Sequence, residues 1–247
     1  MIKIENFEVM GWDHVIRGMR NPMNSWDKSD SGICKGGNDG IGCDNCADCG
    51  CNHSYDHSWQ LGKADHELMM KLAKAGSVHG KFRRMIAVYV DITAPLYWWK
   101  EFDTYKVGTV ANSCSTMHKI HAKEFIVEDF SIEHLEDFYD YHDGITNTEN
   151  DSFFRSCLVG VVYSLNVARK LYLETKDKKY WWQMIQLLPS SYNQKRMVML
   201  NYEVLSNIYQ YRREHKLDEW REFCQWIEKL PYSEIITCNA KGASANA

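Results

Sequence analysis

The chain has 247 residues, of which 45% are hydrophobic and 25% are charged, and this composition excludes an intrinsically disordered chain. Its 29 basic and 33 acidic residues give a net charge of -4, which argues against a nucleic-acid binder that relies on a basic surface. No run of about 18 apolar residues is present, so no membrane span is expected.

The first 100 residues predict a strand, two helices, a second strand and a short helix. Residues 2–9 alternate loosely and indicate a strand, and residues 12–20 have helical spacing until Pro22 interrupts it. A further helix is predicted to end at Gly76. The β-branched run at 85–93 indicates a strand, after which Pro95 opens a short helix.

The second half of the chain is predicted to be mostly helical. Apolar residues recur with a 3.6-residue period over about 153–171, again over 194–214, and once more over 220–227. Strands in the first half and helices in the second predict an α+β fold, a β-sheet flanked by helices. We expect one domain, residues 1–247, with an inserted loop at about 28–62.

The predicted helix at 194–214 carries two polar residues within its apolar arc. At ~100° per residue, Asn201 and Arg212 fall among the apolar side chains, whereas Glu203 and Ser206 fall on the opposite, solvated side. A polar group on a buried face needs a partner. Two interpretations stay open: an arginine–carboxylate pair with another helix, or a wall of a ligand site, for which the guanidinium fork suits a phosphate.

The segment from Leu188 to Arg212 resembles the C-terminal helix of the flavin-dependent thymidylate synthases. Its Leu-Pro pair, Asn201, Asn207 and Arg212 fall at the spacing of that family without a gap. The stretches 9–13, 76–82, 88–90 and 94–97 resemble the family in the same order. The resemblance implies that Asn201 and Asn207 contact flavin and that Arg212 contacts the nucleotide.

The chain departs from the family in its signature motif, which begins with Arg-His-Arg. The equivalent positions, counted from Pro95, are Thr104, Tyr105 and Lys106, and the preceding pair is Lys100 and Glu101. Carried over position by position, the resemblance implies a flavin site made by His79, Thr104, Tyr105, Lys106, Thr109, Asn201 and Asn207. It implies a nucleotide site made by Lys100, Glu101, Asn112, Ser115 and Arg212.

The resemblance implies methylation of dUMP to dTMP, with methylenetetrahydrofolate as carbon donor and with FAD and NADPH as redox cofactors. It also implies a homotetramer. Because the signature motif has lost its arginines, a second interpretation stays open. In that interpretation a divergent homologue binds nucleotide or flavin in a regulatory or structural role, without synthase activity.

The inserted loop is rich in cysteine. Cys43, Cys46, Cys49 and Cys51 place four thiols within nine residues, a density that suits zinc or, as a second choice, an iron–sulfur cluster. The alternative is a thiol-rich surface loop that forms one or two disulfides on oxidation. If the loop binds metal, it is a candidate contact surface for a partner. With no signal peptide recognised, we expect a reducing, cytoplasmic location.

Overall fold

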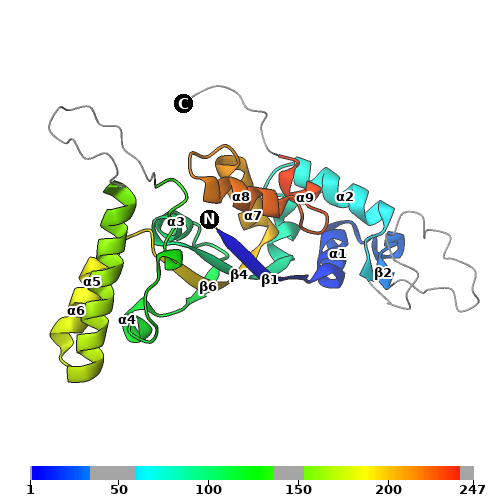
Figure 1. Cartoon of the computed structure of the whole chain (residues 1–247). Coiled ribbons are helices and arrows are strands. Elements are labelled where there is room, and N and C mark those ends of the chain that lie inside the picture. Colours follow the sequence, from blue (N-terminus) through cyan, green and yellow to red (C-terminus); the bar gives the residue numbers. More distant parts are fainter. Residues whose placement is uncertain (1, 34–58, 136–152, 240–247) are drawn as a thin grey trace, which may run out of the picture.

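A computed structural model describes residues 2–33, 59–135 and 153–239 (Figure 1). The strands are β1 (Lys3–Met10), β2 (Gly32–Ile33), β3 (Trp59–Gln60), β4 (Ala87–Pro95), β5 (Val110–Ser113) and β6 (Asn193–Asn201). The α-helices are α1 (Trp12–Arg20), α2 (Lys63–Lys74), α3 (Leu96–Phe102), α4 (Thr116–Lys119), α5 (Phe153–Thr175), α6 (Lys178–Leu187), α7 (Tyr202–Arg212), α8 (Asp218–Ile227) and α9 (Glu234–Thr237). Short 3-10 helices are η1 (Asn21–Met23), η2 (Trp26–Lys28), η3 (Gly80–Met85) and η4 (Val127–Asp129).

The larger sheet has the strand order β1-β4-β6-β5, and all of its neighbouring strands are antiparallel. One face of this sheet is buried. On β4 the side chains of Val88, Val90, Ile92 and Ala94 are buried, whereas those that alternate with them are more exposed. This alternation is what a half-buried antiparallel strand requires. The α+β fold predicted from the sequence is therefore confirmed.

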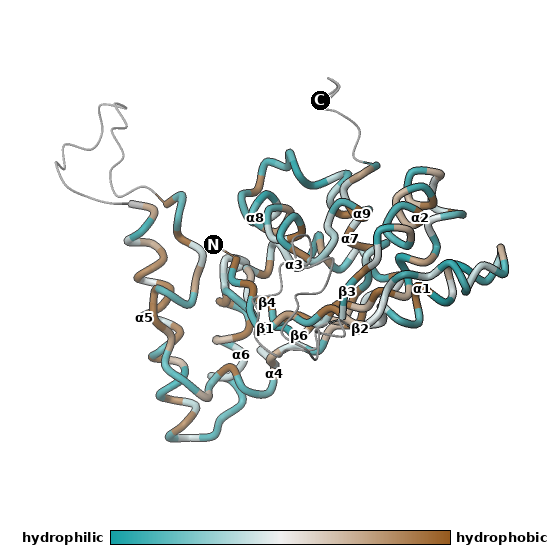
Figure 2. Tube along the Cα trace, turned by 90° about the vertical axis from the view of Figure 1, so that its right-hand side faces the viewer, coloured by the Kyte–Doolittle hydropathy of each residue, from teal (hydrophilic) through white to brown (hydrophobic). Residues whose placement is uncertain are grey.

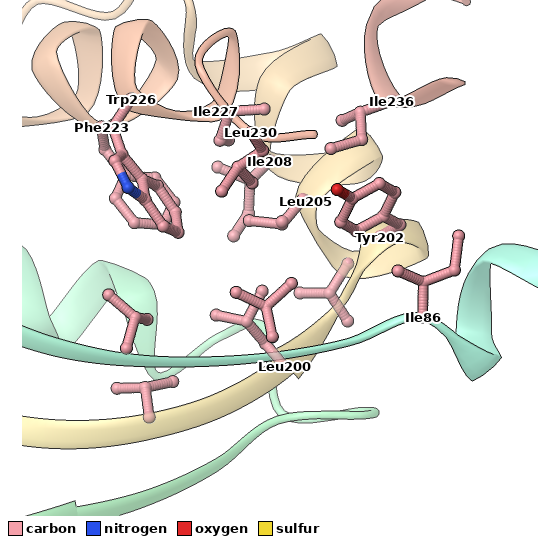
Figure 3. Packing of buried hydrophobic residues seen from close by; sticks show 14 of the residues in the cluster. Ile86, Leu200, Tyr202, Leu205, Ile208, Phe223, Trp226, Ile227, Leu230 and Ile236 are labelled. Carbon is pink, nitrogen blue, oxygen red and sulfur yellow. The ribbon is translucent and has the colours of Figure 1, made fainter. Parts of the chain in front are cut away.

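The main core fills the space between the buried sheet face and the helices above it. Figure 3 shows Leu200 of β6 below Leu205 and Ile208 of α7, with Phe223 and Ile227 of α8 on the far side. Around them, α1, α2, α3 and α9 contribute further buried side chains. The sheet thus has a helical layer on one face, and its other face carries the candidate site.

A second, smaller core joins the α5–α6 hairpin to the segment between β5 and η4. Leu158, Val162 and Leu165 of α5 and Met184 of α6 pack with Phe125 and its neighbours. In Figure 1 this hairpin stands beside the sheet, apart from the helical layer. No helix of the described residues is long and apolar enough to span a membrane.

The prediction of one helix over 194–214 is wrong for its first half. Residues Asn193–Asn201 form β6, which lies between β4 and β5, and α7 begins only at Tyr202. Straight-chain residues such as Gln194, Met197 and Leu200 have good helix propensity, but two neighbouring strands supply ladder hydrogen bonds and a buried face. Tertiary context overrides local propensity here.

The prediction that Glu203 and Ser206 face solvent is also wrong. Both are buried, because the Arg83 guanidinium of η3 reaches them. Arg83 Nε donates to Glu203 Oε2 at 2.8 Å, and Arg83 Nη1 donates to Ser206 Oγ at 3.2 Å and to the Ile235 carbonyl at 3.3 Å. The ion pair between Arg83 and Glu203, with the hydrogen bonds that Arg83 donates, therefore links η3, α7 and α9.

Both ends of the inserted loop are held close to α2. Strand β2 near the start of the loop pairs with strand β3 near its end. The buried Asp65 carboxylate of α2 accepts hydrogen bonds from the Ser29 and Ser31 hydroxyls at 2.8 and 2.7 Å. Arg20 completes this cluster with an ion pair to Asp65 at 2.5 Å. The Ser31 hydroxyl also accepts from the Gly62 amide at 2.9 Å.

Candidate functional site

A cavity of about 770 Å³ lies where β1 and β6 begin and β4 and β5 end. Lys3, Thr93 and Lys195 form a row across β1, β4 and β6, because each is paired in register with the next. The segment from Cys114 to Glu133 closes the other side. Lys3, Lys119, Lys123 and Lys195 all line this cavity, and we call it the four-lysine pocket.

Three of these lysines have carboxylate partners on the chain. Lys3 lies 2.8 Å from Glu5 and Lys123 is paired with Asp129. Lys195 lies 3.0 Å from Asp91, and this hydrogen bond raises the pKa of the lysine. Among the described residues, no carboxylate lies within ion-pairing distance of the fourth, Lys119. Its charge is therefore available to an anionic ligand.

The rest of the pocket wall offers aromatic rings, hydroxyls, a thiol and the three carboxyl groups of Glu128, Asp129 and Glu133. Phe125, Phe130 and Tyr192 supply the rings, and burial raises the pKa of the Tyr192 phenol, which keeps it neutral. Cys114 is a free, exposed thiol beside Lys195, whose carbonyl accepts a hydrogen bond from the Cys114 amide at 2.9 Å. A flat, charged ligand of nucleotide size suits this combination.

Arg212 lies in a separate cluster within the helical layer. Its Nη1 is 2.8 Å from Glu101 Oε2, its Nε donates to the Tyr105 hydroxyl at 3.0 Å, and its guanidinium lies 4.9 Å from the Trp220 ring centroid. Trp220 Nε1 donates to the same Glu101 oxygen at 3.0 Å. His215 stands 3.6 Å from that oxygen, and burial lowers the pKa of its imidazole. The arginine–carboxylate pair is thus formed inside the chain.

Asn201 lies where β6 passes into α7. Asn201 Oδ1 accepts from the Val204 amide at 3.1 Å, so the side chain caps the N-terminus of α7. Gly108 packs against it with φ of +81°, and a Cβ there would come 2.8 Å from Asn201 Nδ2. The adjacent Thr109 Oγ1 is buried and has no hydrogen-bond partner in the described structure. Such an orphaned hydroxyl indicates a missing partner.

No family model matches this chain, and no curated protein matches it in sequence. Solved structures do match it in fold. Two crystal structures of thymidylate synthase X from Helicobacter pylori, both with FAD and dUMP, have a TM-score of 0.58 and 14% identity. The alignments cover 95% and 97% of this chain, and 96% and 99% of those chains. A UMP/dUMP methylase, PolB from Streptomyces cacaoi, bound with 5-Br dUMP, has a TM-score of 0.55 and 13% identity, with 97% and 96% covered.

The chain has the fold of the flavin-dependent thymidylate synthases. This confirms, at the level of the fold, the resemblance inferred from the sequence. Because the alignments span nearly the whole of both chains, the likeness includes the sheet, the helical layer and the α5–α6 hairpin.

On this thymidylate synthase fold, the residues predicted to form the two binding sites fall into separate places. Ser115 lines the four-lysine pocket, where its hydroxyl caps α4 by accepting from the His118 amide at 2.9 Å. Glu101, Tyr105 and Arg212 meet in the helical layer, and Asn201 lies at the β6–α7 junction against Gly108, the residue before Thr109. The remaining predicted residues are exposed and outside these groups: His79, Lys100, Thr104, Lys106, Asn112 and Asn207.

The metal site remains a prediction. Cys43, Cys46, Cys49 and Cys51 lie outside the described residues. Among the residues that the structure does describe, no three His, Cys, Asp or Glu side chains are grouped so that they could hold a metal ion.

Sequence reasoning missed most of the pocket. Lys3, Lys123 and Lys195 were not candidates. For Lys195, an interpretation of 193–201 as a strand would have assigned its side chain to a face of the sheet, although not to a pocket. Strand alternation places Lys195 on the same face as Met197, away from the buried Val198 and Leu200. The helical interpretation of this segment concealed that pattern.

Proposed function

We propose that this protein binds a pyrimidine nucleoside monophosphate, dUMP by analogy with its structural neighbours, in the four-lysine pocket. The observation that carries the proposal is the cavity itself, about 770 Å³, with an unpaired lysine and three aromatic rings, in a fold whose crystallised examples bind FAD and dUMP. Lys119 and Lys195 would hold the phosphate as point charges. Tyr192, Phe125 and Phe130 would contact the base.

We further propose that the protein binds FAD and methylates the uracil base. A bound flavin would supply the hydride, after reduction by NADPH, and methylenetetrahydrofolate would supply the carbon. The buried Thr109 hydroxyl fits this proposal, because it lacks a partner among the described residues and follows Gly108, which packs against Asn201. The task of the chain is to align the base with these groups and to exclude water. A homotetramer belongs to the same proposal.

A second candidate function is nucleotide binding without methylation. It is favoured by two arginines that are already paired with carboxylates in the segment equivalent to the signature motif. Arg212 is paired with Glu101, and Arg196 Nη1 lies 2.8 Å from Asp103 with its guanidinium over Trp99 at 4.2 Å. Neither of these two arginines is free to hold a phosphate. No arginine is among the described residues that line the four-lysine pocket, so anion binding there would depend on its lysines.

The test is the absorbance spectrum of the purified protein after loading with FAD and desalting. The wild-type chain is expected to retain flavin bands, and Thr109→Val, which keeps the shape but removes the hydroxyl, is expected to retain less. If flavin is retained, conversion of dUMP to dTMP separates the two candidates. A wild-type protein that keeps no flavin would contradict the synthase proposal and leave nucleotide binding to be tested alone.

A further inference from the structure

Another cavity lies beside α1, and it shares no lining residue with the four-lysine pocket. Its volume is about 230 Å³, below the roughly 300 Å³ at which pockets for drug-sized ligands begin, so it suits a smaller molecule. In Figures 1 and 2, α1 lies beside β2, at the end of the molecule opposite the α5–α6 hairpin. One side of α1 lines the cavity with residues spaced three and four apart, namely Asp13, Ile16, Arg17 and Arg20.

The positive part of the cavity wall is formed by two arginines, one turn apart on α1. Arg20 is buried, with its Nε 2.5 Å from the Asp65 carboxylate and its Nη1 donating to Ser25. Its Nη2 makes no hydrogen bond within the described part of the chain. Arg17 is exposed and has no ion-pair or hydrogen-bond partner among the described residues. Guanidinium groups with free N–H groups suit a carboxylate.

The negative part of the wall is Asp13, which lies one turn before Arg17. Opposite charges four residues apart on a helix attract each other, and yet these two side chains form no ion pair. Instead, the Asp13 carboxylate accepts a hydrogen bond from Trp59 Nε1, and a neutral indole does not cancel its charge. One positive and one negative group therefore line the same cavity without compensating each other.

The remaining wall is apolar, with one hydroxyl. Trp26 is 50% exposed, and because its Nε1 donates to Asn21 Oδ1 at 2.8 Å, its ring offers carbon atoms to the cavity. The buried Ile16 lies on the same wall. The Ser29 hydroxyl donates its hydrogen to Asp65 at 2.8 Å, so its oxygen is left to accept a hydrogen bond from a ligand.

The charges around the cavity add to zero. The two arginines contribute +2, and Asp13 together with Asp65, the partner of Arg20, contributes -2. A ligand with one negative and one positive group preserves this balance, whereas a simple anion or cation would meet a like charge. We propose that the cavity binds a small zwitterion, an α-amino acid with an apolar side chain.

The carboxylate of this ligand binds the two arginines, and its ammonium group donates to Asp13 and to the Ser29 hydroxyl oxygen. Its side chain lies against Trp26 and Ile16. The inference does not rest on the proposed function, because the two cavities are lined by different residues.

The experiment is a calorimetric titration of the full chain with L-leucine and with two analogues that each lack one charge. L-Leucinamide lacks the carboxylate, and isocaproate lacks the ammonium group. L-Leucine is expected to bind about tenfold more tightly than either analogue, because a hydrogen bond to a charged group is typically worth that factor or more. L-Phenylalanine repeats the test with an apolar side chain of another shape.

Two variants assign each charge to its partner. Arg17→Gln is expected to weaken binding of L-leucine about tenfold and to leave binding of L-leucinamide unchanged. Asp13→Asn keeps an oxygen for Trp59, and is expected to weaken L-leucine equally while leaving isocaproate unchanged. Arg84→Gln, at an exposed position outside the cavity, controls for loss of a positive charge and should bind L-leucine as the wild type does.

Both variants change exposed positions, so they should keep the thermal transition of the wild type, which is recorded alongside. The inference is overturned if neither L-leucine nor L-phenylalanine binds the wild type, or if the analogues bind as tightly as L-leucine. Unchanged affinity of Arg17→Gln and Asp13→Asn for L-leucine would overturn it as well. Titration of dUMP into Arg17→Gln, expected to match the wild type, separates this inference from the proposed function.

Discussion

At the scale of single residues, the four-lysine pocket differs from an arginine-based phosphate site. An ammonium group is a compact point charge, whereas a guanidinium holds two oxygens of a phosphate at once. Lys195 is also shared with Asp91, so Lys119 carries the charge that a ligand can use. We therefore expect this pocket to accept a phosphate in more than one orientation, and its affinity for phosphate to fall as the salt concentration rises.

Cys114 reports directly on occupancy of the pocket. It is free and exposed, and it lines the cavity beside Lys195. We expect dUMP to slow alkylation of Cys114 by iodoacetamide several-fold, because a bound nucleotide would cover the thiol. Peptide mass spectrometry measures the rate, and the exposed thiol of Cys157 on α5 serves as an internal control that should not change. Equal protection of both thiols, or of neither, would argue against binding in the pocket.

Two variants of Asn201 distinguish a role of its side chain in helix stability from a role in ligand binding. As the N-cap of α7 its side chain is worth about 1 kcal/mol, so Asn201→Ala should lower the free energy of unfolding by about that amount. Asn201→Asp keeps an oxygen that can cap the helix and should restore stability. Chemical denaturation measures both variants. If FAD retention falls in both while stability recovers only in Asn201→Asp, the amide also serves the flavin.

At the scale of elements, the sequence predicts those that are decided locally. The helices α1, α2, α3, α5 and α8 and the strands β1 and β4 lie where periodicity, Pro95 and the β-branched run at 85–93 predict them. Four strands were not predicted: the two-residue strands β2 and β3 of the smaller sheet, and β5 and β6 of the larger one. β5 is four exposed residues at a sheet edge, and β6 is built from good helix formers that become a strand only between β4 and β5.

The site was less predictable than the fold, because it depends on contacts between residues that are distant in the sequence. Lys3, Lys119 and Lys195 are far apart in the chain, and only the sheet register and the segment after β5 bring them together. No local pattern marks a lysine as a pocket residue. Arg212, in contrast, was singled out by its place on an apolar arc, and the structure shows that Glu101 satisfies it.

The cluster at the N-terminus of α2 should make stability depend on pH. Burial of Asp65 opposes its ionisation, but hydrogen bonds from Ser31, Ser29 and Arg20 outweigh burial and lower the pKa. A lowered pKa stabilises the fold above the unfolded value of about 3.9, and this contribution is lost as the pH falls through the folded value. At pH 7, Asp65→Asn should cost about 3 kcal/mol, because it breaks a buried ion pair.

The matched measurement is the free energy of unfolding of wild type and Asp65→Asn at pH 7 and at pH values below about 4. The difference between the two proteins should narrow as the pH falls, because the wild-type carboxylate becomes protonated and loses its advantage. A constant difference across this range would mean that Asp65 does not contribute through its charge.

At the scale of the whole molecule, the chain has the fold of the flavin-dependent thymidylate synthases without the arginines of their signature motif. Trp98, Phe102, Trp220 and Phe223 keep α3 and α8 packed over the sheet through ring contacts of 4.7–6.4 Å between centroids. This packing needs no signature arginine. The helical layer therefore holds the sheet and its pocket in place independently of the residues that would perform the chemistry.

The central claim, that the four-lysine pocket binds a pyrimidine nucleoside monophosphate, is tested most directly by calorimetric titration of dUMP into wild type, Lys119→Ala and Lys229→Ala. Lys229 follows α8, is exposed and controls for loss of one positive charge. The account predicts saturable binding to wild type and Lys229→Ala, and about tenfold weaker binding to Lys119→Ala, since a charge-assisted contact contributes about 1.4 kcal/mol or more. Absence of binding to the wild type, or equal affinity in all three proteins, would contradict it.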